Sequence, residues 1–312
     1  MPQLFDTYII VDWSAASTKN TGANSVWIGT LATDGGTAAQ FSADNPSTRL
    51  DAREQILAIA QSHISRGRRV LVGFDFCFGY PEGTAAAFGL RQANRAGWEV
   101  MHNFLAQAIE DGPDNSNNRF RLAADLNATA DSGRHPFWGV PKHLASETLS
   151  TRKSDFTTGQ RPFEFRATEH WIKRRYQARP KSVWQLLGAG AVGSQTLMGI
   201  PTLSHLRKAI PGSKIWPFET GFTTLDSQRL GTTPCVFAEI YPSTLPLNLA
   251  GEDVLDRAQV RQLATALQKC DLDGLLGRRF GLPEDAASIV NNPANTSVLP
   301  AIIDEEGWIL AI

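Results

Sequence analysis

The alternation of short apolar runs with polar turns predicts where the strands of this chain lie. In the first third, the runs cover residues 7–12, 25–31, 38–42 and 69–75, and each has the length and composition of a strand. Between the last two runs, apolar side chains at helical spacing predict a helix from Ser47 to Gly67. Three strands, a helix and a fourth strand indicate an α/β domain.

The rest of the chain is predicted to hold a helical middle and a second set of strands. Helices are predicted at residues 83–110, 164–180, 202–210 and 252–269, and strands at 214–218 and 235–241. Residues 111–160 are rich in Asn, Asp, Ser, Thr and Gly. We expect a long irregular insertion there, a kind of segment that often carries function in a compact domain.

Three of the apolar runs end in an acidic residue. Asp12 ends the first run, Asp75 ends the fourth, and Glu239 ends the run that begins at Cys235. Ligand sites of α/β sheets lie beyond the carboxyl ends of the strands, so these three acids are predicted to converge on one divalent cation. A strand-end acid can instead cap a turn or begin a helix, and for any one acid alone that is the simpler interpretation.

The composition says more about the cellular setting of the protein than about its function. The chain has 312 residues, of which 42% are hydrophobic, and 30 Lys+Arg balance 31 Asp+Glu. A net charge near zero gives no general attraction to nucleic acid or to a membrane surface. The three cysteines are widely spaced, the N-terminus lacks a signal-peptide pattern, and no apolar run has membrane-spanning length. We therefore expect a soluble cytoplasmic protein without a membrane partner.

A glycine-rich turn suggests a second kind of site. Residues 188–193 match the G-x-G-x-x-G pattern, in which Gly188, Gly190 and Gly193 would let the backbone approach a pyrophosphate. The context departs from a dinucleotide-binding unit, because the run before the turn carries Gln185 and no strand-end acid follows at the expected distance. The alternative is a turn of small residues packed against a neighbouring element.

The motifs around the three acids resemble a bacterial domain of unknown function in the ribonuclease-H-like superfamily. They are Val11-Asp12-Trp13-Ser14-Ala15, Gly73-Phe74-Asp75-Phe76 with Gly79-Tyr80-Pro81, and Ala238-Glu239-Ile240-Tyr241-Pro242. The resemblance covers residues 1–82 and 214–312. It implies a mixed five-stranded sheet flanked by helices, in which residues 83–213 form a large, mainly helical insertion.

The resemblance also implies a metal site. Asp12, Asp75 and Glu239 correspond to the superfamily's catalytic acids, which hold Mg²⁺ or Mn²⁺. A fourth acid is expected on the last helix, and Glu306 is the nearest match. Because the chain ends six residues after Glu306, too few for a full helix, Asp271 or Asp273 is the alternative.

Relatives of this core in the actin and sugar-kinase group hold ATP phosphates on the hairpin that follows the first strand. Here that hairpin offers Ser14 and Lys19. Trp13 stands where those relatives have a glycine, and it would crowd a phosphate. A plain polar hairpin loop explains the same residues equally well.

Two further segments carry groups suited to binding. Seven basic residues lie between Arg161 and Lys181, with Trp171 and Tyr176 among them, which suits phosphates and stacked bases. A solvated helix face is the commoner explanation. The loop 132–139 contains His135 beside two aromatic residues; it is either a substrate contact, with His135 as an acid or base, or a packed aromatic anchor.

Together these patterns predict a Mg²⁺- or Mn²⁺-dependent enzyme of phosphoryl transfer or phosphodiester hydrolysis. Its expected partner is a phosphate-containing small molecule or a short nucleic acid, because the net charge does not suit tight binding of a duplex. One alternative is a nucleotide- or dinucleotide-binding protein that uses the turn 188–193. Another is a ribonuclease-H-like scaffold that keeps the fold without the chemistry.

Overall fold

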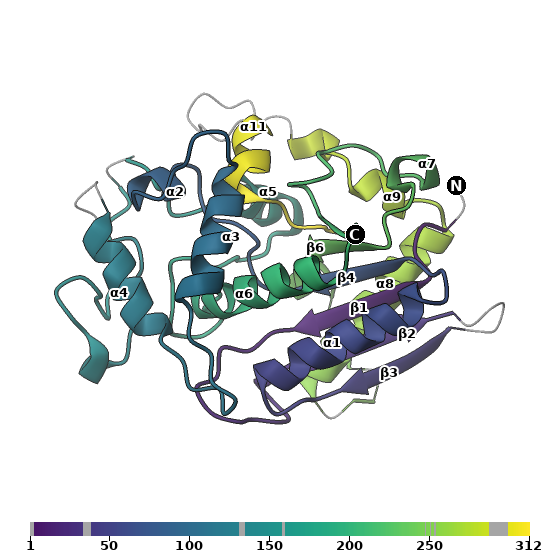
Figure 1. Ribbon diagram of the computed structural model, residues 1–312, viewed down its shortest axis with the longest axis horizontal. Helices are drawn as coiled ribbons and strands as arrows, with labels where there is room; N and C mark the ends of the chain where they lie inside the picture. Colours follow the sequence, from purple (N-terminus) through teal and green to yellow (C-terminus); the bar gives the residue numbers. More distant parts are fainter. Residues whose placement is uncertain are drawn as a thin grey trace.

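A six-stranded mixed sheet forms the centre of the protein (Figure 1). The computed structural model describes residues 3–33, 39–130, 135–157, 160–246, 248–249, 251–252, 254–286 and 299–312. The strands are β1 (Thr7–Asp12), β2 (Trp27–Ala32), β3 (Gln40–Asp44), β4 (Val70–Phe74), β5 (Lys214–Ile215) and β6 (Cys235–Glu239), in the order β3-β2-β1-β4-β6-β5. The first three form an antiparallel meander, whereas β1, β4, β6 and β5 run parallel.

Helices of very different length surround the sheet. The longer ones are α1 (Arg49–Ile64), α3 (Gly97–Ala108), α4 (Arg119–Thr129), α5 (Ala167–Tyr176), α6 (Gly193–Ala209) and α8 (Leu255–Leu272). The short ones are α2 (Thr84–Ala87), α7 (Ser227–Leu230), α9 (Leu276–Arg279), α11 (Leu299–Ala301) and the turns η1 (Lys142–Leu144), η2 (Pro242–Thr244), η3 (Glu284–Ala286) and η4 (Ile302–Glu306). Within the described ranges, no helix combines the length and apolar character that crossing a membrane requires.

Both faces of the sheet are buried, since successive side chains of a strand point to opposite sides. Ile9 and Val11 of β1 belong to a core built with α1, α3, α4 and α6. Helices α1 and α6 lie in front of the sheet in Figure 1, whereas α3 and α4 lie to its left. Tyr8 and Ile10 belong to a second core built with α5, α8 and α9. Residues between 83 and 213 therefore pack directly on the sheet.

Helix α8 lies close against β2 because Gly29 has no side chain. A Cβ atom at Gly29 would come within 2.9 Å of the Val260 side chain, closer than a real Cβ contact. The N-terminal end of α8 is thereby brought to the end of the sheet where β1 finishes. This packing places the first turn of α8 beside Asp12.

The predicted α/β class and mixed sheet are confirmed, but the number of strands is six rather than the predicted five. The apolar runs predict all six strands, including one at 214–218, whereas the resemblance implies five. Strand β5 covers only Lys214–Ile215 of that predicted strand, at the sheet edge, and among the described residues it pairs with β6 alone. The Trp216 N–H still donates to the Phe237 carbonyl (2.9 Å), and Pro217, which has no N–H, then ends the pairing.

Three helical regions differ from the sequence-based expectation. The helix predicted at 83–110 is divided into α2 and α3, with residues 88–96 between them. Helix α4 lies in the segment expected to be irregular, because its buried apolar side chains, Leu122, Ala123 and Leu126, are too few to show a clear period in so polar a segment. Helix α6 begins at Gly193 rather than near Thr202 and continues through Pro201. A proline removes one helical hydrogen bond, but most of α6 is buried against the sheet and its neighbours.

Candidate active site

Asp12 and Asp75 meet at the ends of two adjacent parallel strands. Val11 of β1 pairs with Phe74 of β4, so the residues that follow them, Asp12 and Asp75, lie at the same end of the sheet. The two carboxyl groups are close enough for each to shift the pKa of the other, and the Trp13 N–H donates to Asp75 Oδ1 (2.8 Å). Two carboxyl groups in contact need a shared proton or a cation between them.

A third acid, Asp256, belongs to the same end of the sheet. It lies in the first turn of α8 and lines one pocket together with Asp12 and Asn24. Its Oδ2 accepts a hydrogen bond from the Asn24 N–H (2.7 Å). Asp256 was not among the predicted site residues, because the fourth acid was expected closer to the end of the chain. The detectable signal was an acidic residue in the first turn of the last long helix.

The protonation of these acids reflects their burial and mutual repulsion. Burial raises the pKa of Asp12 well above its usual range, and the charges of Asp75 and Asp256 raise it further. Burial also raises the pKa of Asp75 to about 7, although the N–H of Trp13 opposes this shift. Burial raises the pKa of Asp256. Among the described residues, none of the three acids forms a salt bridge.

Glu239 follows the same strand-end pattern but has a different neighbour. It is paired with Phe74 in the sheet, and its carboxylate binds the guanidinium of Arg166 at both oxygens (2.6 and 2.8 Å). The Phe78 N–H donates to Oε2 as well (2.9 Å). Burial raises the pKa of Glu239, and the charge of Arg166 opposes that shift. A cation, the guanidinium, already accompanies this carboxylate.

One buried group has spacing that suits a metal. The ligand atoms of Cys77, Glu169 and Glu239 lie within 4.8 Å of one another, and no other three His, Cys, Asp or Glu residues do so in the described ranges. Arg166 binds both glutamates, with Nη2 2.5 Å from Glu169 and 2.6 Å from Glu239. Burial also raises the pKa of the Cys77 thiol, which disfavours the thiolate that a metal needs. The position suited to a cation is thus held by Arg166.

The residues considered for a fourth ligand lie in other environments. Glu306 accepts hydrogen bonds from the N–H groups of Glu82 (3.0 Å) and Ala167 (2.9 Å). Asp271 binds the Tyr8 hydroxyl (2.6 Å) and the N–H of Leu4, near the beginning of β1 and so far along the strand from Asp12. Asp273 is half-exposed and pairs with Lys269 of the same helix.

The glycine turn lines the pocket that holds Asp12. This pocket, of about 410 Å³, is lined by Gly188, Gly190 and the first turn of α6 as well as by Arg119. A neighbouring pocket of about 300 Å³ contains Asp75 and Glu239 and shares Gly190 and Gln195 with the first. The Gln195 side chain donates to the Trp13 carbonyl (2.5 Å). The turn and the acids are therefore parts of one composite pocket.

The glycine turn is not part of a strand–turn–helix unit of the sheet. The residues before it make one isolated bridge, between Gln185 and Trp138, and no strand. Gly193 instead permits a close approach: a Cβ there would lie 2.3 Å from the Val183 carbonyl oxygen. Gly188 and Gly190 adopt left-handed backbone conformations (φ 116° and 70°), which glycine accommodates without strain.

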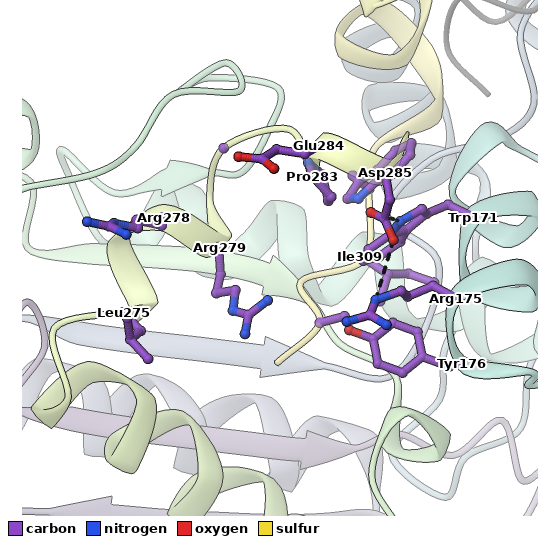
Figure 2. Close-up of a pocket in the computed structure, with 13 residues that line it drawn as sticks. Trp171, Arg175, Tyr176, Leu275, Arg278, Arg279, Pro283, Glu284, Asp285 and Ile309 are labelled. Carbon is purple, nitrogen blue, oxygen red and sulfur yellow. Dashed lines mark hydrogen bonds and ion pairs between the residues drawn. The ribbon is translucent and has the colours of Figure 1, made fainter. Parts of the chain in front are cut away.

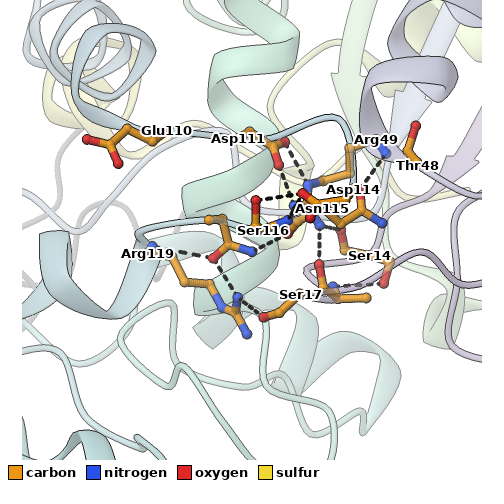
Figure 3. A network of polar contacts seen from close by, with 12 residues as sticks. Ser14, Ser17, Thr48, Arg49, Glu110, Asp111, Asp114, Asn115, Ser116 and Arg119 are labelled. Atoms are coloured by element: carbon orange, nitrogen blue, oxygen red, sulfur yellow. Dashed lines mark hydrogen bonds and ion pairs between the residues drawn. The ribbon is translucent and has the colours of Figure 1, made fainter.

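The loop after β1 is held in place by side chains of helices α1 and α4 and of the segment between α3 and α4. Arg49 of α1 is buried, donates to the carbonyls of Ser14 and Ala16 (3.3 and 2.6 Å), and pairs with Asp111 (Figure 3). The Asn115 side chain donates to the Thr18 carbonyl (3.0 Å). Ser14 lines the pocket, whereas Lys19 is exposed and is not among the lining residues.

The basic segment between residues 161 and 181 is divided among three environments. Arg166 is buried with Glu239, whereas Arg179 and Lys181 line the pocket of Asp75. Trp171, Arg175 and Tyr176 line a separate pocket of about 460 Å³, where Arg175 pairs with Asp285 (Figure 2). The segment is therefore not one continuous solvated helix face.

The aromatic loop around His135 packs into the core in part. Phe137 is fully buried and lies against Trp184 and Phe88. Residues 132–134 of the predicted loop lie outside the described residues. His135 is not among the residues that line the described pockets.

Comparison with known proteins gives no match. No protein-family model, no curated protein and no solved structure is significantly similar to the chain.

Proposed function

We propose that the protein is a divalent-metal-dependent enzyme of phosphoryl transfer or phosphodiester hydrolysis, with Asp12, Asp75 and Asp256 as the metal-binding acids. The observation that carries the proposal is the proximity of Asp12 and Asp75, which line two adjoining pockets and form no salt bridge with a described residue. Carboxylates removed from water, even in part, are normally paired or bound to a metal. A divalent cation would replace the shared proton and neutralise both groups.

The strand arrangement supports a ribonuclease-H-like core as the framework. An antiparallel meander of β1 to β3, followed after a helix by β4 parallel to β1, is the order that the sequence motifs imply. In that core, an acid on the first strand lies beside an acid on the fourth, as Asp12 lies beside Asp75. Strand β6 extends the sheet on the far side of β4.

The chemistry proposed follows from the donor atoms. Carboxylate oxygens are hard ligands that suit Mg²⁺ and Mn²⁺. Such an ion polarises a phosphoryl oxygen and lowers the pKa of bound water. Burial raises the pKa of Asp12 well above its usual range, which favours its protonated form when the ion is absent. The carboxylate oxygens of Asp12, Asp75 and Asp256 do not all lie within 4.8 Å of one another, so Asp256 would contribute from α8 through a water molecule bound to the ion. Glu239 would serve to hold Arg166 in place.

Manganese binding is the direct test. We expect Mn²⁺ to bind the purified protein at micromolar to millimolar concentration, detected by electron paramagnetic resonance, and to raise its melting temperature. Asp12→Asn and Asp75→Asn should each weaken that binding at least tenfold and abolish hydrolysis of a panel of phosphodiester substrates. Asp273→Asn is the matched control, since Asp273 is a half-exposed acid on the surface, and it should change neither property.

Two outcomes would count against the proposal. Failure of the wild-type protein to bind Mn²⁺ would exclude a metal site of useful affinity. Metal binding without turnover of any phosphoester would favour the non-catalytic scaffold.

A further inference from the structure

The pocket that contains Asp12 also contains a cationic side chain. Asp12 and Asp256 line this pocket, and so do Arg119 from α4 and Ser194 from the first turn of α6. A proposed metal accounts for the acids only, and Arg119 therefore needs a separate explanation.

Arg119 is a buried cation without an acidic partner. Only 8% of the residue is exposed, and among the described residues its contacts are neutral: Nε donates to Ser194 Oγ (3.0 Å), and Nη1 donates to Ser17 Oγ (2.8 Å) and to Asn117 Oδ1 (2.6 Å). Figure 3 shows the guanidinium beside Ser17. Nη2 has no hydrogen bond to any residue of the described ranges, although it belongs to a side chain that lines the pocket.

The nearby charges make an anion at this point favourable. Burial and the charge of Arg49 lower the pKa of Arg119 to about 10, while the charge of Asp111 opposes that shift, so the group remains cationic at neutral pH. Arg49 is neutralised by Asp111 at close range, whereas Arg119 forms no salt bridge with a described residue. A buried charge without a partner is costly, and that cost is relieved by a ligand of opposite charge.

The first turn of α6 adds hydrogen-bond donors to the pocket that Arg119 lines. This helix has 17 residues, and the N–H groups of Ser194 and Gln195 have no hydrogen-bond acceptor among the described residues. Free N–H groups and the helix dipole both favour an anion at a helix N-terminus. The adjacent Gly188 and Gly190 lack side chains that would fill the space.

We propose that Arg119 and the first turn of α6 form an anion subsite that binds a phosphate group of the substrate, in the same pocket as the acids. The inference rests on the proposed function for the identity of the substrate, but the subsite itself binds phosphate whether or not a metal is present. A phosphate group held there shares its pocket with Asp12 and Asp256. Arg119 is thus a substrate-binding residue contributed by the segment between β4 and β5.

Binding of inorganic phosphate, measured by isothermal titration calorimetry without metal, tests the subsite. We expect saturable binding to the wild-type protein and at least a tenfold loss in Arg119→Gln. The matched control is Arg121→Gln, because Arg121 lies on the same helix with 64% of its side chain exposed and pairs with Glu110 on the surface. The control should bind phosphate within twofold of the wild type.

A substitution at the surface tests the subsite even if the Arg119 variant does not fold. Ser17 is exposed and its Oγ already contacts Nη1, so Ser17→Asp would place a carboxylate on Arg119 without disturbing the core. We expect it to weaken phosphate binding at least tenfold, whereas Ser17→Asn, similar in shape but neutral, should leave it within twofold.

The outcomes separate the two proposals. Phosphate binding that is unchanged in Ser17→Asp and in folded Arg119→Gln overturns the subsite, while Mn²⁺ binding in the same variants leaves the metal proposal intact. Phosphate binding that is lost in these variants but present in Asp12→Asn supports the subsite even if Mn²⁺ never binds. Failure of the wild-type protein to bind phosphate at millimolar concentration also overturns the subsite.

Discussion

The guanidinium of Arg166 binds Glu239 through two parallel hydrogen bonds, in which Nη1 lies 2.8 Å from Oε2 and Nη2 lies 2.6 Å from Oε1. Both side chains are buried, with exposures of 0% and 3%. Arg166 also binds Glu169 through Nε (2.9 Å), so one cation serves two carboxylates. Glu239 is thus part of a buried ion-pair network with Arg166 and Glu169.

Removal of Arg166 should destabilise the fold strongly. Arg166→Leu would leave two buried carboxylates without a cationic partner, and we expect a loss of about 3–5 kcal/mol in the free energy of unfolding, measured by urea denaturation. Arg175→Leu, on the same helix with a 58% exposed side chain, should cost less than about 1 kcal/mol. Equal effects of the two substitutions would contradict the buried-network interpretation.

The metal-free protein should lose stability as the pH rises toward neutrality. Folding raises the pKa of Asp75 from 3.8 to about 7 and that of Asp12 in the same direction, so the folded state keeps protons that the unfolded state has released. Stability therefore falls between about pH 4 and pH 7, by on the order of 4 kcal/mol at about 1.4 kcal/mol per pH unit. Subtracting the denaturation profile of the double variant Asp12→Asn with Asp75→Asn isolates this contribution. A difference that does not change with pH would disprove it.

The same protons should compete with a metal ion. Carboxylates must be deprotonated to bind Mn²⁺, so the apparent affinity should fall about tenfold for each pH unit below 7 while one proton is displaced. Titration of Mn²⁺ by electron paramagnetic resonance between pH 5.5 and 8 would measure this slope. Affinity independent of pH would place the ion at acids with ordinary pKa values.

Asp256 should contribute to metal affinity without being essential for folding. It is half-buried at the first turn of α8, and a single backbone N–H, that of Asn24, binds its carboxylate. Asp256→Asn should weaken Mn²⁺ at least tenfold while changing the unfolding free energy by less than about 1 kcal/mol, because the amide oxygen can still accept from Asn24. Unchanged metal affinity would remove Asp256 from the proposed donor set.

The glycines of the turn should differ in their tolerance of a side chain. Gly193→Ala would put Cβ 2.3 Å from the Val183 carbonyl oxygen, and we expect a loss of about 1–3 kcal/mol as the start of α6 shifts. At Gly190, a Cβ would meet only the flexible side chain of Lys181, at 3.5 Å. There the cost should be about 1 kcal/mol, from the left-handed backbone alone. Thermal denaturation of both variants checks the order.

Local patterns predicted the strands well because each strand is short, apolar and bounded by polar turns. The neighbouring positions of Asp12 and Asp75 could be inferred from the order of elements only together with the resemblance described above, since helix α1 joins β3 to β4 and these two strands are not neighbours in the sheet. Helix α4 and the early start of α6 could not be inferred, because their formation depends on burial against other helices rather than on their own periodicity. The edge strand β5 ends at Ile215, two residues before Pro217, and is therefore shorter than the apolar run that predicted it.

The partners of the site residues were the least predictable part. Nothing in the local sequence shows that Glu239 meets Arg166, which lies 73 residues earlier. Nor does it show that Asp256 meets Asn24 across 232 residues, or that Arg119 reaches Ser17 across 102. Each of these contacts depends on how α5, α8 or α4 packs on the sheet, which is a property of the whole fold.

The loop after β1 is held by Arg49, Asn115 and Asp256, three anchors spread along most of the chain. During synthesis on a ribosome, Asp12 is made early, but the last of these anchors leaves the exit tunnel only after residue 256. A nascent chain with both strand-end aspartates therefore lacks a preformed cage for a cation. If the proposed metal binds, we expect tight binding only after folding is complete, so that the ion stabilises the folded protein and does not assist the folding of the nascent chain.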